Sequence, residues 1–306
     1  MRRVGIIGTG LVGATCGYAL ITQNVCQEIL LIDINQERAQ GEMLDLMNSV
    51  QFMSQRTKVR VASYEDCKDV DIIIFTAGAA PKKGQTRLDT LGVSAVICES
   101  VVKDVMASGF NGFFVVASNP VDIISYHIWK LSGLPKNKVI GTGTSIDTAR
   151  LKDILAPSIN VNPNQILAYV LGEHGDSQII PWSVVTVGGI PLLNYIKESL
   201  DLDDIARKTA QVGWEIYKQK GTTYYGIAAA VVGIIKAIFY DEQIIMPTSA
   251  MLEGEYEEFN IYTGVPTIIG KNGVESVLEI PLTQDELNAF KHSNNVLREY
   301  MKTIGE

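Results

Sequence analysis

The 306-residue chain is poor in histidine and cysteine, which restricts the chemistry it can perform. It has three histidines and four cysteines, and the cysteines show no CxxC spacing (Cys16, Cys26, Cys67 and Cys98). Metal centres and disulfide frameworks usually show themselves in the spacing of their ligands, so we predict neither a metal site nor disulfides. Free thiols are typical of a reducing compartment, and we expect a cytoplasmic protein. Few side chains are left for acid–base chemistry near neutral pH.

The sequence also lacks long apolar runs and an excess of basic residues. The longest apolar stretch, 226–235, is too short to span a bilayer and stops at Lys236. The segment Met1-Arg2-Arg3 leads directly into a strand-like run, which leaves no room for a signal peptide. A net charge of −8 disfavours nucleic acid and anionic membrane surfaces. We therefore expect neither a nucleic-acid nor a membrane partner.

The first half of the chain alternates short apolar runs with amphipathic segments. Parallel strands that are covered on both faces need continuous rather than alternating apolarity. Four runs have this character: 4–7, 29–32, 70–75 and 113–116. Helical segments lie between them, for example at 11–22 and 94–106. This βαβ order predicts an α/β fold with a doubly wound parallel sheet of the Rossmann type.

The second half has a mixed α+β character. Gly188-Gly189 and Asn272-Gly273 separate β-rich runs and predict tight hairpins. Helices are expected at 201–219 and 223–240, and a last helix opens with a capping box at Thr283 and Glu286, with an apolar stripe at Leu287, Phe290, Leu297 and Met301. We place the first, Rossmann-type domain at 1–143 and the second domain at 144–306.

A glycine fingerprint, Gly8-Thr9-Gly10-Leu11-Val12-Gly13, follows the first strand and opens a helix. In this context Gly8 permits a tight turn, Gly10 lets the backbone approach a pyrophosphate, and Gly13 allows close helix–strand packing. Asp33 follows the next strand, where its carboxylate can bind ribose hydroxyls and would repel a 2′-phosphate. The sequence therefore predicts an NAD site and favours NAD over NADP.

His174 lies in Gly172-Glu173-His174-Gly175-Asp176-Ser177, after an apolar run at 166–171 that we interpret as a buried strand. A histidine between glycines at a strand end can face a small ligand. It can equally just line a turn, and the residue alone does not decide between these interpretations.

Further motifs follow the glycine fingerprint in a set order: 77–79 with 86–89, 118–122, 141–144 with 147–150, and 172–177. This series resembles the L-lactate/malate dehydrogenase family, on its lactate dehydrogenase side, from the first strand to the last helix. The resemblance implies that His174 is the acid–base residue and that Asp147 bonds its other ring nitrogen. Arg150 would bind a substrate carboxylate through its guanidinium fork, although this spacing also suits an intrahelical salt bridge.

The resemblance assigns the remaining site residues as well. Arg87 would lie on a mobile loop that closes over the substrate and stabilises charge on the carbonyl, with an ordinary surface loop as the alternative. Asn119 would bond the nicotinamide ribose and the substrate oxygen. Thr223 and Ile227 match positions beside substrate and nicotinamide, where they can also simply be packing residues. The other two histidines match no motif, and we interpret them as structural or exposed (His127 and His292).

Two departures from the family pattern bear on substrate and regulation. Where the family has glutamine for lactate or arginine for malate, this chain has Pro81, so no cation is supplied for a second carboxylate. Pro81 and Gly213 could admit a larger apolar side chain. Members activated by fructose 1,6-bisphosphate carry an arginine and a histidine where this chain has Lys152 and Leu167. We therefore expect no strong activation by that ligand.

These observations predict an NAD-dependent L-2-hydroxy-acid dehydrogenase that interconverts pyruvate and L-lactate. One alternative is an L-2-hydroxyisocaproate-type dehydrogenase acting on bulkier 2-oxo acids. An alternative of another class is a catalytically silent NAD-binding protein. The resemblance implies a homotetramer or a homodimer with a small 2-oxo or 2-hydroxy acid as its partner.

Overall fold

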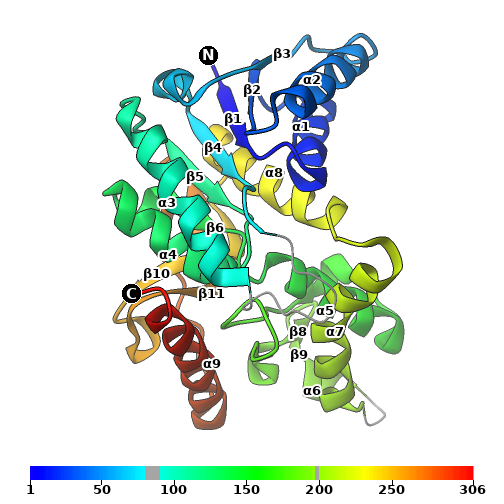
Figure 1. Ribbon diagram of the computed structural model, residues 1–306. Helices are drawn as coiled ribbons and strands as arrows, with labels where there is room; N and C mark the ends of the chain where they lie inside the picture. Colours follow the sequence, from blue (N-terminus) through cyan, green and yellow to red (C-terminus); the bar gives the residue numbers. More distant parts are fainter. Residues whose placement is uncertain (80–89, 197–199, 306) are drawn as a thin grey trace.

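The structure is a computed structural model that describes residues 1–79, 90–196 and 200–305 (Figure 1). Its main sheet has the strand order β12-β11-β10-β6-β5-β4-β1-β2-β3. Six strands are parallel: β1 (Arg3–Ile7), β2 (Glu28–Ile32), β3 (Lys58–Val61), β4 (Ile72–Phe75), β5 (Phe113–Val116) and β6 (Val139–Gly141). Connections run outward from β1 in both directions, which confirms the predicted doubly wound α/β sheet.

Helices cover both faces of this sheet. One face carries α1 (Leu11–Thr22), α2 (Gln36–Val50) and α8 (Tyr225–Tyr240), and the other carries α3 (Leu91–Ala107), α4 (Val121–Ser132) and α9 (Gln284–Lys302). The predicted capping box of α9 is present, with Thr283 accepting from the Glu286 N–H. No helix of the described ranges is long and apolar enough to cross a membrane.

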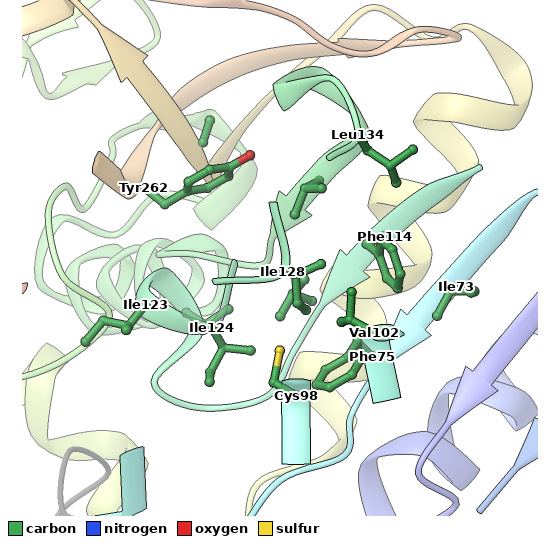
Figure 2. Close-up of a cluster of buried hydrophobic side chains, with 14 of the residues drawn as sticks. Ile73, Phe75, Cys98, Val102, Phe114, Ile123, Ile124, Ile128, Leu134 and Tyr262 are labelled. Atoms are coloured by element: carbon green, nitrogen blue, oxygen red, sulfur yellow. The ribbon is translucent and has the colours of Figure 1, made fainter. Parts of the chain in front are cut away.

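Strands buried on both faces explain the continuous apolar runs. Along β4, Ile72 and Ile74 pack into the cluster beneath α1 and α8, while Ile73 and Phe75 pack into the cluster beneath α3 and α4. Figure 2 shows the second cluster, where Phe75 and Phe114 from the sheet face Cys98 and Val102 of α3. Every position of such a strand is therefore apolar, as parallel pairing requires.

The sheet continues beyond the boundary that we predict at residue 143. Three antiparallel strands of the second half, β10 (Ile244–Glu253), β11 (Phe259–Gly270) and β12 (Gly273–Val277), extend it through the pairing of Ser249 with Gly141. β11 and β12 form the predicted hairpin at Asn272-Gly273. The boundary at residue 143 stays a prediction, because one sheet spans both halves.

The rest of the second half forms a smaller layer beside the main sheet (Figure 1). It contains a three-stranded sheet, β7 (Ile166–Leu167), β8 (Thr186–Val187) and β9 (Ile190–Pro191), with α5 (Ser145–Ile159), α6 (Leu192–Tyr195) and α7 (Leu202–Lys220). β8 and β9 pair across Gly188-Gly189 as predicted. Short 3₁₀ helices lie in the connections: η1 (Tyr64–Asp69), η3 (Lys136–Lys138), η4 (Pro163–Gln165), η5 (Trp182–Val184) and η6 (Glu255–Glu257).

The prediction of a buried strand over 166–171 is wrong for most of its length. Only Ile166–Leu167 forms a regular strand, and Leu167 is 50% exposed. Beyond β7, Val170 bonds to hydroxyl groups around α5: its N–H donates to Thr148 Oγ1 at 2.9 Å, and its carbonyl accepts from Thr144 Oγ1 at 2.5 Å. Leu171 pairs with Ile179, but only as an isolated bridge. The apolar run is buried except at Leu167, and its pattern did not reveal the hydrogen-bond partners of its main chain.

Candidate active site

The glycine fingerprint has the geometry that a dinucleotide requires. Gly8 has a φ of +94°, which favours glycine, and a Cβ on Gly13 would lie 2.0 Å from the Gly8 carbonyl oxygen. A Cβ on Gly10 would meet nothing within 4 Å, so space is open beside this peptide. Helix α1 begins here with no side-chain cap and no acidic residue in its first turn. Its first N–H groups are therefore suited to the pyrophosphate of NAD.

Asp33 follows β2 at the same edge of the sheet. Its Oδ2 accepts from the N–H and the hydroxyl of Thr9 at 2.6 and 2.9 Å, and its Oδ1 accepts from the Asn35 N–H at 2.8 Å. Partial burial disfavours the charge, but the hydrogen bonds from Asn35 and Thr9 outweigh it and hold the pKa of Asp33 below its ordinary value. The carboxylate is therefore ionised beside the glycine fingerprint, as ribose binding needs.

His174, Asp147 and Arg150 form one buried group. His174 Nδ1 lies 2.5 Å from Asp147 Oδ2, and Arg150 Nη1 donates to Asp147 Oδ1 at 2.9 Å. The side chains are 8% exposed for His174 and Arg150 and 3% for Asp147. The intrahelical ion pair that the spacing of Asp147 and Arg150 suggests is thus present, and the same carboxylate also orients the imidazole.

A cleft of about 180 Å³ brings five of the predicted site residues together. Its lining includes Asn119, Arg150, His174, Thr223 and Ile227, together with Gly213. The cleft thus has a guanidinium and an imidazole facing a space large enough for a small acid. Arg87 and Pro81 lie outside the described residues, so what we predict for them stays a prediction.

Two aromatic residues of the cleft were missed by sequence reasoning. Trp214 and Tyr217 on α7 line it, with ring centroids 5.9 Å apart. The available signal was their spacing of three residues on a predicted helix, directly after Gly213. Such a pair is more often a packing pair, so the sequence did not single it out.

Asp122 contacts the main chain of His174. It lies in the first turn of α4, is 2% exposed, and its Oδ2 accepts from the His174 N–H at 2.9 Å. Burial above all, and then the neighbouring charges of Glu173 and Asp147, raise the pKa of Asp122 to about 7 against the lowering effect of its hydrogen bonds. Asp122 occurs in one of the family motifs, but sequence reasoning gave it no role.

We expect Asp122 to make the stability of the protein depend on pH. Its pKa in the folded state, about 7, lies above its pKa in the unfolded state. At a pH between the two pKa values, the folded chain therefore binds more protons at this carboxyl than the unfolded chain does. Stability therefore falls as pH rises from about 4 to about 7, at about 1.4 kcal/mol for each unit of pKa difference. Urea unfolding of the wild type and Asp122→Asn across this range measures it. The variant should gain stability relative to the wild type with rising pH, and a constant difference would contradict the expectation.

The remaining histidines and the cysteines have structural settings. His127 is buried, with Nε2 3.4 Å from Glu99 Oε1, and His292 is exposed on α9. The four cysteines are free and buried, and burial raises the pKa of each thiol to about 12 (Cys16, Cys26, Cys67 and Cys98). The prediction of free thiols is confirmed, and none of them is an activated nucleophile.

A glycine fingerprint at the edge of a parallel sheet, followed by a cleft with a His–Asp–Arg group, defines an NAD-dependent dehydrogenase. Residues 2–141 match the family model described as lactate/malate dehydrogenase, NAD binding domain, and residues 144–306 match its alpha/beta C-terminal domain. The chain therefore belongs to the lactate/malate dehydrogenase family. It is an NAD-dependent oxidoreductase of 2-hydroxy acids.

Individual relatives are similar over their whole length. The chain is 58% identical to L-lactate dehydrogenase 3 of Bacillus cereus, over 99% of this chain and 98% of that one. It is 41% identical to an L-lactate dehydrogenase of Lactococcus lactis subsp. cremoris, with the same coverage. The crystal structure of the minor L-lactate dehydrogenase from Enterococcus mundtii in its ligands-bound form superposes with a TM-score of 0.95 at 45% identity, over 99% of this chain and 98% of that one.

Proposed function

We propose that the protein is an L-lactate dehydrogenase: pyruvate, NADH and a proton give L-lactate and NAD, and the reaction is reversible. The observation that carries this is the buried His174–Asp147–Arg150 group, which lies in a cleft whose lining also includes Asn119. A base, a carboxylate-binding cation and a dinucleotide site are the three parts that this reaction needs.

His174 donates the proton to the carbonyl oxygen of pyruvate, and in reverse it accepts the hydroxyl proton of lactate. Asp147 fixes the tautomer and ring orientation of His174 and stabilises its charged form, because its carboxylate lies at Nδ1. Arg150 binds the substrate carboxylate, and its bond to Asp147 holds the guanidinium in place. A hydride for the carbonyl carbon is supplied by NADH when it is bound. Asn119 bonds the substrate oxygen and the nicotinamide ribose, and Arg87 adds positive charge at the carbonyl.

The curated relatives support pyruvate and lactate as the substrate pair and give no support to a catalytically silent protein or to a hydroxyisocaproate-type enzyme. Pro81 argues against malate, since it offers no cation to a second carboxylate. The size of the accepted side chain depends on Pro81, Gly213 and the aromatic wall of Trp214 and Tyr217. We further propose a homotetramer or homodimer in the cytoplasm.

Specificity constants for a panel of 2-oxo acids test this function. Pyruvate, 2-oxobutyrate, 2-oxoisocaproate, phenylpyruvate and oxaloacetate are compared by the loss of NADH absorbance, and pyruvate with NADPH serves as the cofactor control. We expect the highest kcat/KM with pyruvate and NADH. A higher value with oxaloacetate would refute the inference from Pro81, and bound NADH without any oxidation would favour a silent protein.

Activation by fructose 1,6-bisphosphate is not expected. Leu167 is 50% exposed and offers an apolar surface, and burial lowers the pKa of the half-buried Lys152. A bisphosphate would need strong donors at both positions. A large drop in the KM for pyruvate on adding this ligand would refute the proposal.

A further inference from the structure

The main-chain N–H groups of Glu173 and His174 each donate a hydrogen bond to a side chain on a helix distant in the sequence. The Glu173 N–H donates to Ser293 Oγ of α9 at 2.9 Å, and the His174 N–H donates to Asp122 Oδ2 of α4 at 2.9 Å. Ser293 is 0% exposed and Asp122 is 2% exposed. Water therefore does not compete for these bonds, and α4 and α9 together fix the peptide that carries His174.

The segment 172–177 is adapted to this contact. Gly172 pairs with Gly264 of β11 through two hydrogen bonds of 2.9 Å, and a Cβ on Gly172 would lie 2.4 Å from Ser293 Oγ. The absence of a side chain at Gly172 thus lets Ser293 reach the main chain. Ser293 Oγ also lies 3.0 Å from Ser177 Oγ, so one hydroxyl contacts both ends of the segment.

The buried carboxyl of Asp122 is an unfavourable acceptor for a single N–H group, because burial destabilises its charged form. Transfer of an ionised carboxylate out of water is unfavourable unless it is well paired, and burial opposes the ionisation of Asp122. Serving fold stability alone would not require a carboxyl at this position. Ser125, one turn further along α4, shows the ordinary case, because its hydroxyl donates to the Val121 carbonyl of its own helix at 2.6 Å.

We propose that Asp122 and Ser293 are positioning residues, which set the His174 imidazole against the substrate carbonyl by binding the N–H groups of His174 and Glu173. This inference rests on the proposed function of His174. Neither residue is among those that line the cleft in the described part of the chain, so both act through the main chain. Proton transfer needs near-attack geometry, and a displacement of about 1 Å can cost about 10²-fold in rate.

The test compares four variants with the wild type: Asp122→Ala, Asp122→Asn, Ser293→Ala and, as a matched buried control, Ser125→Ala. Rates are expressed per NADH-binding site, titrated by NADH fluorescence. We expect Asp122→Ala and Ser293→Ala to lower kcat with pyruvate by about 10–100-fold, while the KM for pyruvate and the Kd for NADH stay unchanged. Asp122→Asn should recover most of the rate because its amide oxygen still accepts from the His174 N–H. Ser125→Ala should keep the wild-type kcat.

The outcomes separate this inference from the proposed function. A wild-type protein that binds NADH but does not oxidise it with pyruvate fails the proposed function. An active wild type with unchanged kcat in Asp122→Ala and Ser293→Ala overturns the positioning role, as does an equal loss in Ser125→Ala. Should Asp122→Ala bind no NADH, Ser293→Ala decides: a lowered kcat supports the role and a wild-type kcat overturns it.

Discussion

Replacement of His174 by asparagine should lower kcat for pyruvate reduction by about 10²–10⁴-fold, the range that a general acid–base residue contributes. Asparagine is close to the imidazole in size and can still bond Asp147, whose Oδ2 lies 2.5 Å from His174 Nδ1. It cannot deliver a proton to the carbonyl oxygen near neutral pH. The rate of NADH oxidation at saturating pyruvate measures the effect. The Kd for NADH should be unchanged, because the glycine fingerprint and Asp33 are intact.

His292→Asn is the matched control, since this histidine is exposed on α9 and is not among the residues that line the cleft. It should retain the wild-type kcat. If His174→Asn kept more than about a tenth of the wild-type rate, the loss would be smaller than the contribution of a general acid–base residue. Another group would then have to carry the proton. Sequence and structure offer no second histidine among the described cleft residues.

Arg150→Lys should raise the KM for pyruvate by about 10–100-fold. Lysine keeps the positive charge next to Asp147 but cannot present two parallel N–H groups to the substrate carboxylate. The loss of one charge-assisted hydrogen bond corresponds to about 1.5–3 kcal/mol, or roughly a factor of 10 to 100 in affinity. Initial rates over a range of pyruvate concentrations separate KM from kcat. We expect the larger change in KM, because the carboxylate is bound in both ground state and transition state.

Arg298→Lys is the control for this substitution. Arg298 also pairs with a buried carboxylate, Glu258, but it lies on α9 and is not a cleft residue. Its replacement should leave the KM for pyruvate unchanged. An unchanged KM in Arg150→Lys would mean that Arg150 serves only the ion pair with Asp147, which is the alternative that the spacing left open.

Parts of the site could be predicted from the sequence because they depend on neighbours in the chain. The turn at Gly8 and the packing at Gly13 are dictated by a strand–turn–helix of a few residues, and Asp33 follows the next parallel strand. Asp147 and Arg150 are three residues apart on one helix, so their contact follows from helical geometry. The roles of Arg87 and Pro81 stay predictions.

Other parts could not be predicted because a local pattern does not reveal a distant partner. The run at 166–171 is buried except at Leu167, but the main chain of Val170 bonds to the hydroxyls of Thr144 and Thr148 instead of to a neighbouring strand. The strands β10–β12 have the appearance of a separate β-rich region. Only their pairing with β6 makes them part of the main sheet. An apolar pattern predicts that a segment is buried, but it does not identify the segment to which the main chain bonds.

The sequence by itself determined the class of chemistry: an NAD site at the glycine fingerprint and, through the family resemblance, a histidine with a carboxylate and a guanidinium. Tertiary structure alone decided how these groups are held. It brought Trp214 and Tyr217 to the cleft and placed Asp122 and Ser293 against the main chain of His174. The reason is physical: residue type and short-range spacing specify what a group can do, whereas its orientation depends on helices that meet it only after the chain has folded.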